Sequence, residues 1–204
     1  MRMSAEKKRE RILHVLATAY GHHKQWQEVQ ENALDQLHSM SNLAKQLAAL
    51  GECKAAGRLG CLAWYPQLVE LLEAKILASF ERALGFVYKH KETLADLSKN
   101  LKCNWKESER LLADIVGLQG DERALFSTEV SFSLADITEW LKLLNAACVY
   151  DLSEKQVALD HIACTPNSTE KVLSVWSRSH VEDLIEVIEC VNYTVEQFKK
   201  TGNG

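Results

Sequence analysis

The strongest constraint on the fold is a long apolar stripe at helical spacing in the first quarter of the chain. Between Ile12 and Leu47, apolar residues recur at steps of three and four, the spacing that places side chains on one face of an α-helix. The stripe passes Gly21 without losing phase. Only Pro66 and Pro166 interrupt the sequence of 204 residues with proline. We therefore expect one long helix in this region, with any bend at Gly21.

A second long helix is expected after Pro66. Residues 51–64 hold three glycines and lose the apolar period, which predicts a loop. Proline lacks a backbone N–H, so it fits the first turn of a helix, where that donor has no partner. The apolar stripe that follows comprises Leu68, Leu71, Leu72, Ile76, Phe80, Ala83, Val87, Leu94 and Leu97. The pattern falters over residues 98–104 and then resumes, so it leaves open whether residues 66–117 form one helix or two.

Short polar side chains and a proline mark the ends of the later elements. We expect a loop over residues 117–132 and a helix after it, because Ser133 followed by Asp136 resembles a capping box. The serine hydroxyl accepts a hydrogen bond from an orphan backbone N–H, and the carboxylate is favoured at the positive end of the helix dipole. Pro166 is expected to end this helix, and a short helix is expected over residues 169–176.

The remaining pattern fixes the fold class. Ser179 with Glu182 forms a second capping arrangement, which predicts a last amphipathic helix. No run alternates between apolar and polar residues at period two, so no sheet is expected. Short loops between long helices make neighbouring helices antiparallel. The sequence therefore predicts an all-α fold, a bundle of long antiparallel amphipathic helices, in a single domain over residues 1–204.

Charge and cysteine usage argue against several classes of protein. The formal net charge of −4 is unlike that of a general nucleic-acid binder, which needs a basic face. No apolar stretch reaches the roughly 20 residues that span a bilayer, and the N-terminus lacks the features of a secretory signal. We therefore expect an intracellular protein that does not bind membranes. In a reducing compartment, the six scattered cysteines are expected to be free thiols.

No motif predicts a metal, cofactor or catalytic site. His161 and Cys164 lie three residues apart, but a tetrahedral zinc site needs two more ligands. Gly51, Gly57 and Gly60 match neither a dinucleotide-binding nor a phosphate-binding loop. The acidic residues of the last helix are expected to form a solvated face, because no buried partner for acid–base chemistry is evident. We therefore expect no cofactor and no enzymatic activity.

Aromatic residues separate core candidates from contact candidates. Trp26, Trp140 and Trp176 lie on or beside apolar stripes, so we expect them to pack in the core. Trp64 and Tyr65 precede the second helix, and Trp105 lies in the segment where the apolar period falters, so these three are less clearly buried. Tryptophan and tyrosine at such positions are typical anchors for a protein partner.

Three segments carry a resemblance to a known family. They are Trp26 with residues 41–47 (SNLAKQL), residues 65–68 (YPQL) and, above all, residues 133–141 (SLADITEWL). In this order and spacing they resemble the AIRIM family, a ribosome maturation factor that binds AAA+ ATPases of the Afg type. The resemblance covers most of the chain from about residue 10 onward.

This resemblance implies a non-catalytic adaptor of an Afg-type AAA+ ATPase, acting with a second small helical subunit, a cyclin-dependent-kinase-interacting protein. It implies a role in late maturation of the large ribosomal subunit and in protein turnover at replicating chromatin, in the cytoplasm and the nucleus. The candidate partner contacts within the three motifs are Asn42, Tyr65, Pro66, Leu68, Asp136, Glu139 and Trp140.

Two other interpretations stay open at this point. Long amphipathic helices also fit a generic helical scaffold or a coiled-coil protein that dimerises. A helical-bundle enzyme would need a polar, partly buried cavity with titratable groups of shifted pKa.

Overall fold

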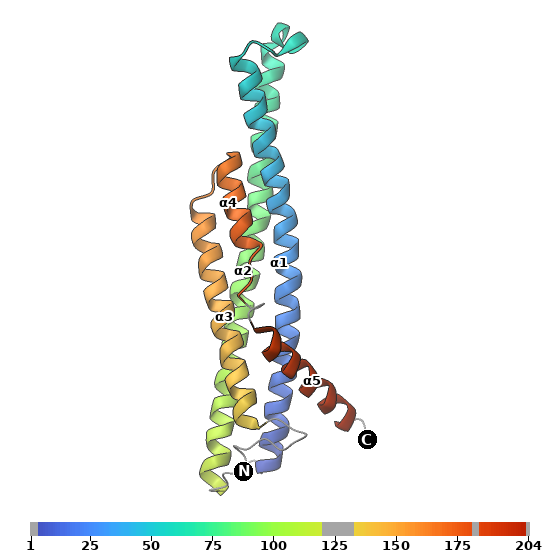
Figure 1. Cartoon of the computed structure of the whole chain (residues 1–204), viewed down its shortest axis with the longest axis vertical. Coiled ribbons are helices and arrows are strands. Elements are labelled where there is room, and N and C mark those ends of the chain that lie inside the picture. Colours follow the sequence, from blue (N-terminus) through green and yellow to red (C-terminus); the bar gives the residue numbers. More distant parts are fainter. Residues whose placement is uncertain (1–3, 120–132, 181–183, 203–204) are drawn as a thin grey trace. The chain divides into compact units, whose positions relative to one another are not determined.

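The computed structural model describes residues 4–119, 133–180 and 184–202, and in these ranges it contains helices and no strand. The elements are α1 (Ala5–Ala55), a 3₁₀-helix η1 (Gly60–Trp64), α2 (Pro66–Gln119), α3 (Leu134–Asp160), α4 (Pro166–Trp176) and α5 (Ile185–Gly202) (Figure 1). The prediction of an all-α fold built from long helices is confirmed. So is the single long helix across Gly21, because α1 continues through that residue.

The chain divides into two compact units, and three helices contribute to both. Unit 1 comprises Met1–Gln27, Ala95–Asp151 and Ser179–Gly204. Unit 2 comprises Glu28–Leu94 and Leu152–Arg178. Each unit therefore contains a piece of α1, α2 and α3, and the units differ in that α5 belongs to unit 1 and α4 to unit 2. The prediction of a single domain over residues 1–204 stays a prediction.

Burial along the two longest helices follows a seven-residue repeat. On α1 most of the buried positions form two sets spaced by sevens, which are Ile12, Ala19, Trp26, Ala33, Met40 and Leu16, His23, Gln30, Leu37, Ala44. On α2 the corresponding sets are Ile76, Ala83, Leu97, Leu111 and Phe80, Val87, Leu94, Leu101, Ser108, Ile115. Alternating steps of three and four that repeat every seven residues form the seam of coiled-coil packing. We call this seven-residue repeat the heptad seam.

In unit 1, α1 and α2 run antiparallel. Lys8 Nζ lies 3.2 Å from Asp114 Oδ2, and Arg11 Nε lies 2.8 Å from Glu107 Oε1. Residue numbers therefore rise along α1 as they fall along α2, which defines the antiparallel direction. The Arg11 pair is partly exposed and contributes little to stability, so the buried seam holds these helices together and the ion pairs mark its register.

In unit 2, α4 is fastened at its C-terminal end by two other helices. Gln30 Nε2 on α1 donates to the carbonyl of Trp176 at 3.1 Å, and Lys155 Nζ on α3 donates to the carbonyl of Arg178 at 3.3 Å. Lys155 Nζ also lies 6.0 Å from the centroid of the Trp176 ring. Carbonyl groups at a helix C-terminus lack partners in the helix and carry partial negative charge, so a buried lysine is stabilised there. Trp176 itself is fully buried.

The first loop is shorter than the sequence predicted. Residues 51–64 were expected to form a loop, but α1 continues to Ala55 and residues 60–64 form η1. Gly51 is helical, whereas Gly57 and Gly60 adopt positive φ angles of 64° and 58°. The left-handed conformation favours glycine, so Gly57 and Gly60 form the turn. Gly51 does not interrupt α1.

The second helix resolves the open alternative. Residues 66–117 belong to one continuous helix, α2, which begins at Pro66 as predicted and ends at Gln119. The expected loop over residues 117–132 is therefore wrong for residues 117–119, and its remainder, residues 120–132, lies outside the described residues. The pattern falters because the seam positions after Leu101 carry polar side chains, the half-buried Asn104 and the buried Ser108.

The later helix ends agree in part with expectation. Ser133 caps α3 as predicted, because Asp136 N donates to Ser133 Oγ at 3.0 Å and Ser133 N donates to Asp136 Oδ2 at 2.9 Å. Pro166 was expected to end α3, but α3 ends at Asp160 and Pro166 begins α4, capped by Thr165. The same first-turn preference that places Pro66 explains this position. The proposed cap of Ser179 by Glu182 lies partly outside the described residues.

One buried imidazole interrupts the heptad seam of unit 1. His23 is buried, and neither of its ring nitrogens has a hydrogen-bond partner among the residues that the structure describes. Burial lowers the pKa of His23 below its usual value of 6.5, because the charged form loses its hydration. The folded state therefore favours the neutral ring.

Replacing Trp176 with alanine is expected to lower the free energy of unfolding by about 3–5 kcal/mol, because a fully buried aromatic side chain leaves a cavity. Trp64→Ala is the matched control and is expected to change it by about 0.5 kcal/mol or less, because Trp64 is exposed. Denaturant unfolding followed by circular dichroism measures both. Equal effects of the two substitutions would contradict the assigned core.

Acidification is expected to destabilise the fold through His23. Below pH 6.5 the unfolded chain binds a proton at this ring, whereas the folded chain resists protonation, so protons favour unfolding. Denaturation midpoints measured from pH 7.5 down to about pH 5.5 should fall less steeply for His23→Leu than for the unsubstituted protein. Identical slopes for the two proteins would show that His23 does not titrate in this way.

Candidate partner-binding surface

The turn between α1 and α2 directs large apolar side chains into solvent. After Gly60, η1 ends with Tyr65 N donating to the carbonyl of Leu62 at 3.0 Å, and Leu68 N donates to the carbonyl of Tyr65 at 2.9 Å. Backbone hydrogen bonds therefore continue from the 3₁₀-helix into the first turn of α2. No residue of η1 is buried, so the side chains of this turn project away from the core of unit 2.

Five exposed apolar side chains gather at this turn and on the first two turns of α2. They are Trp64, Tyr65, Leu68, Leu71 and Leu72, and we call them the apolar tip. Trp64 is 83% exposed and Leu71 64% exposed. Single exposed apolar residues are ordinary on protein surfaces, but a sequence-local group of this size marks a site of interaction. Tryptophan and tyrosine are also the residues most enriched among binding anchors.

The three leucines of the apolar tip correct the sequence prediction. Leu68, Leu71 and Leu72 were expected to belong to the apolar stripe that faces the core, but they are exposed. The heptad seam instead enters α2 at Val69 and continues through Ile76. At about 100° per residue, Leu71 lies roughly opposite Val69 and Ile76, whereas Leu68 and Leu72 flank the seam on its solvent side. The step of seven from Val69 to Ile76 was the signal that distinguished the two faces.

The candidate contact residues fall into two groups. Asn42, Tyr65, Pro66 and Leu68 belong to unit 2, and all four are exposed. Tyr65, Pro66 and Leu68 lie together at the apolar tip, whereas Asn42 lies on α1. Their role as contacts stays a prediction.

The remaining candidates lie at the start of α3 in unit 1. Asp136 is a capping residue, because its carboxylate accepts from the backbone and the hydroxyl of Ser133. Glu139 is exposed and pairs with Lys142 at 3.2 Å, and Trp140 is half-buried rather than fully in the core. Glu139 is therefore the most accessible side chain of this motif, and its contact role also stays a prediction.

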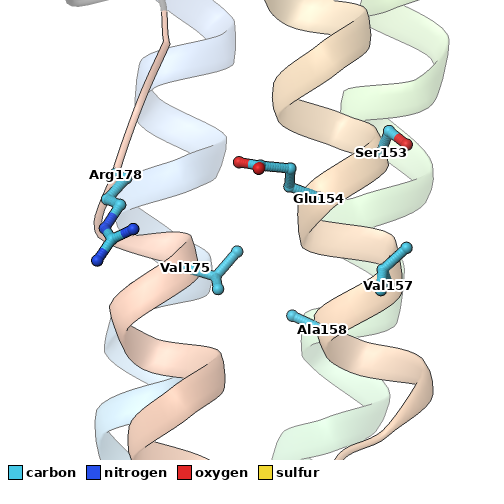
Figure 2. Close-up of a pocket in the computed structure, with 6 residues that line it drawn as sticks. All are labelled: Ser153, Glu154, Val157, Ala158, Val175 and Arg178. Atoms are coloured by element: carbon cyan, nitrogen blue, oxygen red, sulfur yellow. The ribbon is translucent and has the colours of Figure 1, made fainter.

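Unit 2 also has an open groove between α3 and α4. It has a volume of about 340 Å³ and is lined by Ser153, Glu154, Val157, Ala158, Val175 and Arg178. Figure 2 shows Glu154 projecting from α3 toward the α4 side, and Val175 projecting from α4 toward α3. Its lining contains one carboxylate and one guanidinium above an aliphatic floor. No imidazole or thiol lies among the six lining residues.

Histidine, cysteine and acidic side chains are the groups that could hold a metal ion. In the described ranges, residues 4–119, 133–180 and 184–202, no group of three His, Cys, Asp or Glu side chains is arranged to hold a metal ion. None of the six cysteines forms a disulfide bond. Burial raises the pKa of the Cys164 thiol, because the thiolate loses hydration. Among these same residues, no helix is long and apolar enough to cross a membrane.

The chain is thus an all-α protein of long helices that exposes a group of large apolar side chains, the apolar tip. Comparison with known families identifies the group within this class. The family model described as Ribosome biogenesis protein C1orf109-like matches residues 9–191, so the chain belongs to this family of ribosome biogenesis proteins. It is the AIRIM family that the three sequence motifs indicated, and that prediction is confirmed. A protein of ribosome biogenesis acts inside the cell. A search among curated proteins gave no match.

Trp64 is expected to dominate the solvent-accessible tryptophan fluorescence. Trp26 and Trp176 are fully buried, so iodide reaches Trp64 far more readily than either of them. Trp105 and Trp140 are half-buried, so they are quenched only in part. Trp64→Phe should therefore lower the Stern–Volmer constant clearly, whereas Trp176→Phe, the matched control, should not lower it. Stern–Volmer measurements on the folded variants check this. Unchanged quenching in Trp64→Phe would contradict the exposed tip.

Proposed function

We propose that this chain is a non-catalytic adaptor subunit of an Afg-type AAA+ ATPase complex that acts in late maturation of the large ribosomal subunit. Membership of the ribosome biogenesis family over residues 9–191 is the observation that carries the proposal. The ATPase and the late stage come from the resemblance of the three motifs to the AIRIM family. The same resemblance supports a second small helical subunit as partner, and work in both the cytoplasm and the nucleus.

The apolar tip supports a binding role. Its tryptophan, tyrosine and three leucines are exposed, and covering apolar surface with a partner is favourable because it removes that surface from water. The YPQL motif that carries part of the resemblance lies within this surface, since it contains Tyr65 and Leu68. A recognised motif and an exposed anchor therefore coincide at one turn.

An adaptor needs no catalytic groups of its own, and the groove between α3 and α4 gives no specific support to an enzyme. Its two charged side chains, Glu154 and Arg178, have opposite signs and stand above aliphatic residues. We therefore propose that this protein acts by binding and that the ATPase carries out the catalysis.

Binding to a purified Afg-type ATPase held with a non-hydrolysable ATP analogue tests the proposal. We expect a stable complex. The double substitution Trp64→Ala/Tyr65→Ala should raise its Kd about tenfold or more, because anchors of this kind contribute over 1 kcal/mol each. Biolayer interferometry or sedimentation measures the change.

Two further variants sharpen that experiment. Tyr193→Ala is the matched control, because Tyr193 is an exposed tyrosine on α5, and it should leave the Kd unchanged. Glu139→Ala probes the motif at the start of α3 separately. Absence of any complex between the unsubstituted chain and the ATPase would overturn the proposal. Self-association of the chain alone, with no ATPase bound, would favour the dimerising scaffold.

A further inference from the structure

The apolar tip continues along α2 as a basic face. Lys75, Arg82 and Lys89 are exposed and are separated by seven residues each, so they lie on one side of the helix with Leu68. Phe86 lies between the last two and is 45% exposed, with Lys89 Nζ 5.4 Å from its ring centroid. We call Lys75, Arg82, Phe86 and Lys89 the basic stripe.

The basic stripe contains no carboxylate. The positions of α2 that share this side from residue 68 to residue 89 are Leu68, Leu71, Leu72, Lys75, Ala78, Ser79, Arg82, Gly85, Phe86 and Lys89. The glutamates of the same stretch, Glu70, Glu73 and Glu81, occupy other positions of the seven-residue repeat. Glu92 is the first acidic residue to return to this side.

The three cations of the stripe have no acidic partner among the residues that the structure describes. In the part of the chain that the structure describes, no carboxylate lies within 4 Å of Lys75, Arg82 or Lys89. Elsewhere on α2, Lys99 and Lys106 pair with acids three residues away. This face of α2 therefore combines leucine and phenylalanine with cations that have no acidic partner. It differs in charge from the chain as a whole, whose formal net charge is −4.

We propose that the face of α2 from Leu68 to Lys89 docks an acidic amphipathic helix of a partner protein. Apolar side chains of that helix pack against Leu68, Leu71 and Leu72, and its aspartates and glutamates pair with the basic stripe. The inference rests on the proposed function only for the existence of a protein partner. It adds the chemistry that this partner must present.

The geometry favours a helix as the occupant. At 1.5 Å per residue, the face extends for about 32 Å, and its charges recur every seven residues, the repeat at which a second helix packed along α2 presents its own side chains. Nucleic acid is the weaker fit, because phosphates offer nothing to three exposed leucines and because three cations release few counterions. Complementary charge along the face sets orientation and speeds association.

Site-specific photocrosslinking tests the inference in the full chain. A benzoylphenylalanine residue in place of Ala78, which is exposed in the middle of the face, is irradiated in cells, and the crosslinked peptide is sequenced by mass spectrometry. The control places the same residue at Ala113, which is exposed on the unit 1 part of α2. We expect position 78, and not position 113, to crosslink to a helical segment rich in aspartate and glutamate.

Charge reversal provides the second arm. Lys75→Glu/Arg82→Glu/Lys89→Glu should reduce the crosslink from position 78 at least tenfold, whereas Lys99→Glu/Lys102→Glu/Lys106→Glu, an equal charge change on exposed residues of the same helix, should leave it unchanged. Circular dichroism and thermal midpoints verify that both triple variants fold. A tenfold loss in the control as well would overturn the inference, because the effect would then follow net charge.

The outcomes separate this inference from the proposed function. Crosslinks from position 78 to RNA, to a basic or extended segment, or to a second copy of the chain would each overturn the acidic helix. If the stripe variant keeps its nucleotide-dependent binding to the ATPase and position 78 crosslinks to none of its partners, the inference fails and the proposed function stands. If position 78 crosslinks to an acidic helix but no ATPase binds the chain, the proposed function alone fails.

Discussion

The heptad seam is the constraint on which the rest of this structure depends. Helices of 51 and 54 residues gain most of their stability from packing an apolar face, because helix propensity alone is marginal in water. In each unit the seam supplies that face to both α1 and α2. Because the seam uses a single side of α2, the opposite side is free to carry other side chains. In unit 2 the basic stripe and Leu71 lie away from the seam, and Leu68 and Leu72 flank it on the solvent side.

Buried polar side chains position α4 within unit 2. Gln30 stands among apolar neighbours of the repeat, and its amide reaches the C-terminal end of α4. Lys155 reaches the same end from α3. Buried polar side chains are tolerated when their hydrogen bonds are made, so these two residues hold α4 at one position and one direction within unit 2. His23 has no such partner among the described residues, and its buried ring gives unit 1 a sensitivity to acid.

Much of this fold could be predicted from the sequence because its signals are local. The apolar period gave α1, the first-turn proline gave the start of α2, and the pairing of Ser133 with Asp136 gave the start of α3. Helix ends were harder. Gly51 and Pro166 were expected to interrupt helices, but a helix tolerates glycine when its neighbours pack, and proline serves equally at a helix start.

The surface was less predictable than the core. The exposure of Trp64 and Tyr65 follows from their place outside the apolar period. Leu68, Leu71 and Leu72 match the spacing of core residues equally well, because steps of three and four do not tell which apolar face a neighbouring helix covers. Only the seven-residue step through Val69 and Ile76 makes that distinction. Partner identity has no local signal in these residues, and it entered through the resemblance to a family.

The account's central claim is that the apolar tip and the basic stripe of α2 form a surface that a protein partner covers. Hydroxyl-radical footprinting of the chain alone and within the assembled ATPase complex tests this most directly, because it reports side-chain access residue by residue. The account predicts that Leu71 and Phe86, both exposed in the free chain, lose reactivity on assembly, while Tyr193 keeps it. Unchanged reactivity of Leu71 and Phe86 in a complex that has demonstrably formed would contradict the claim.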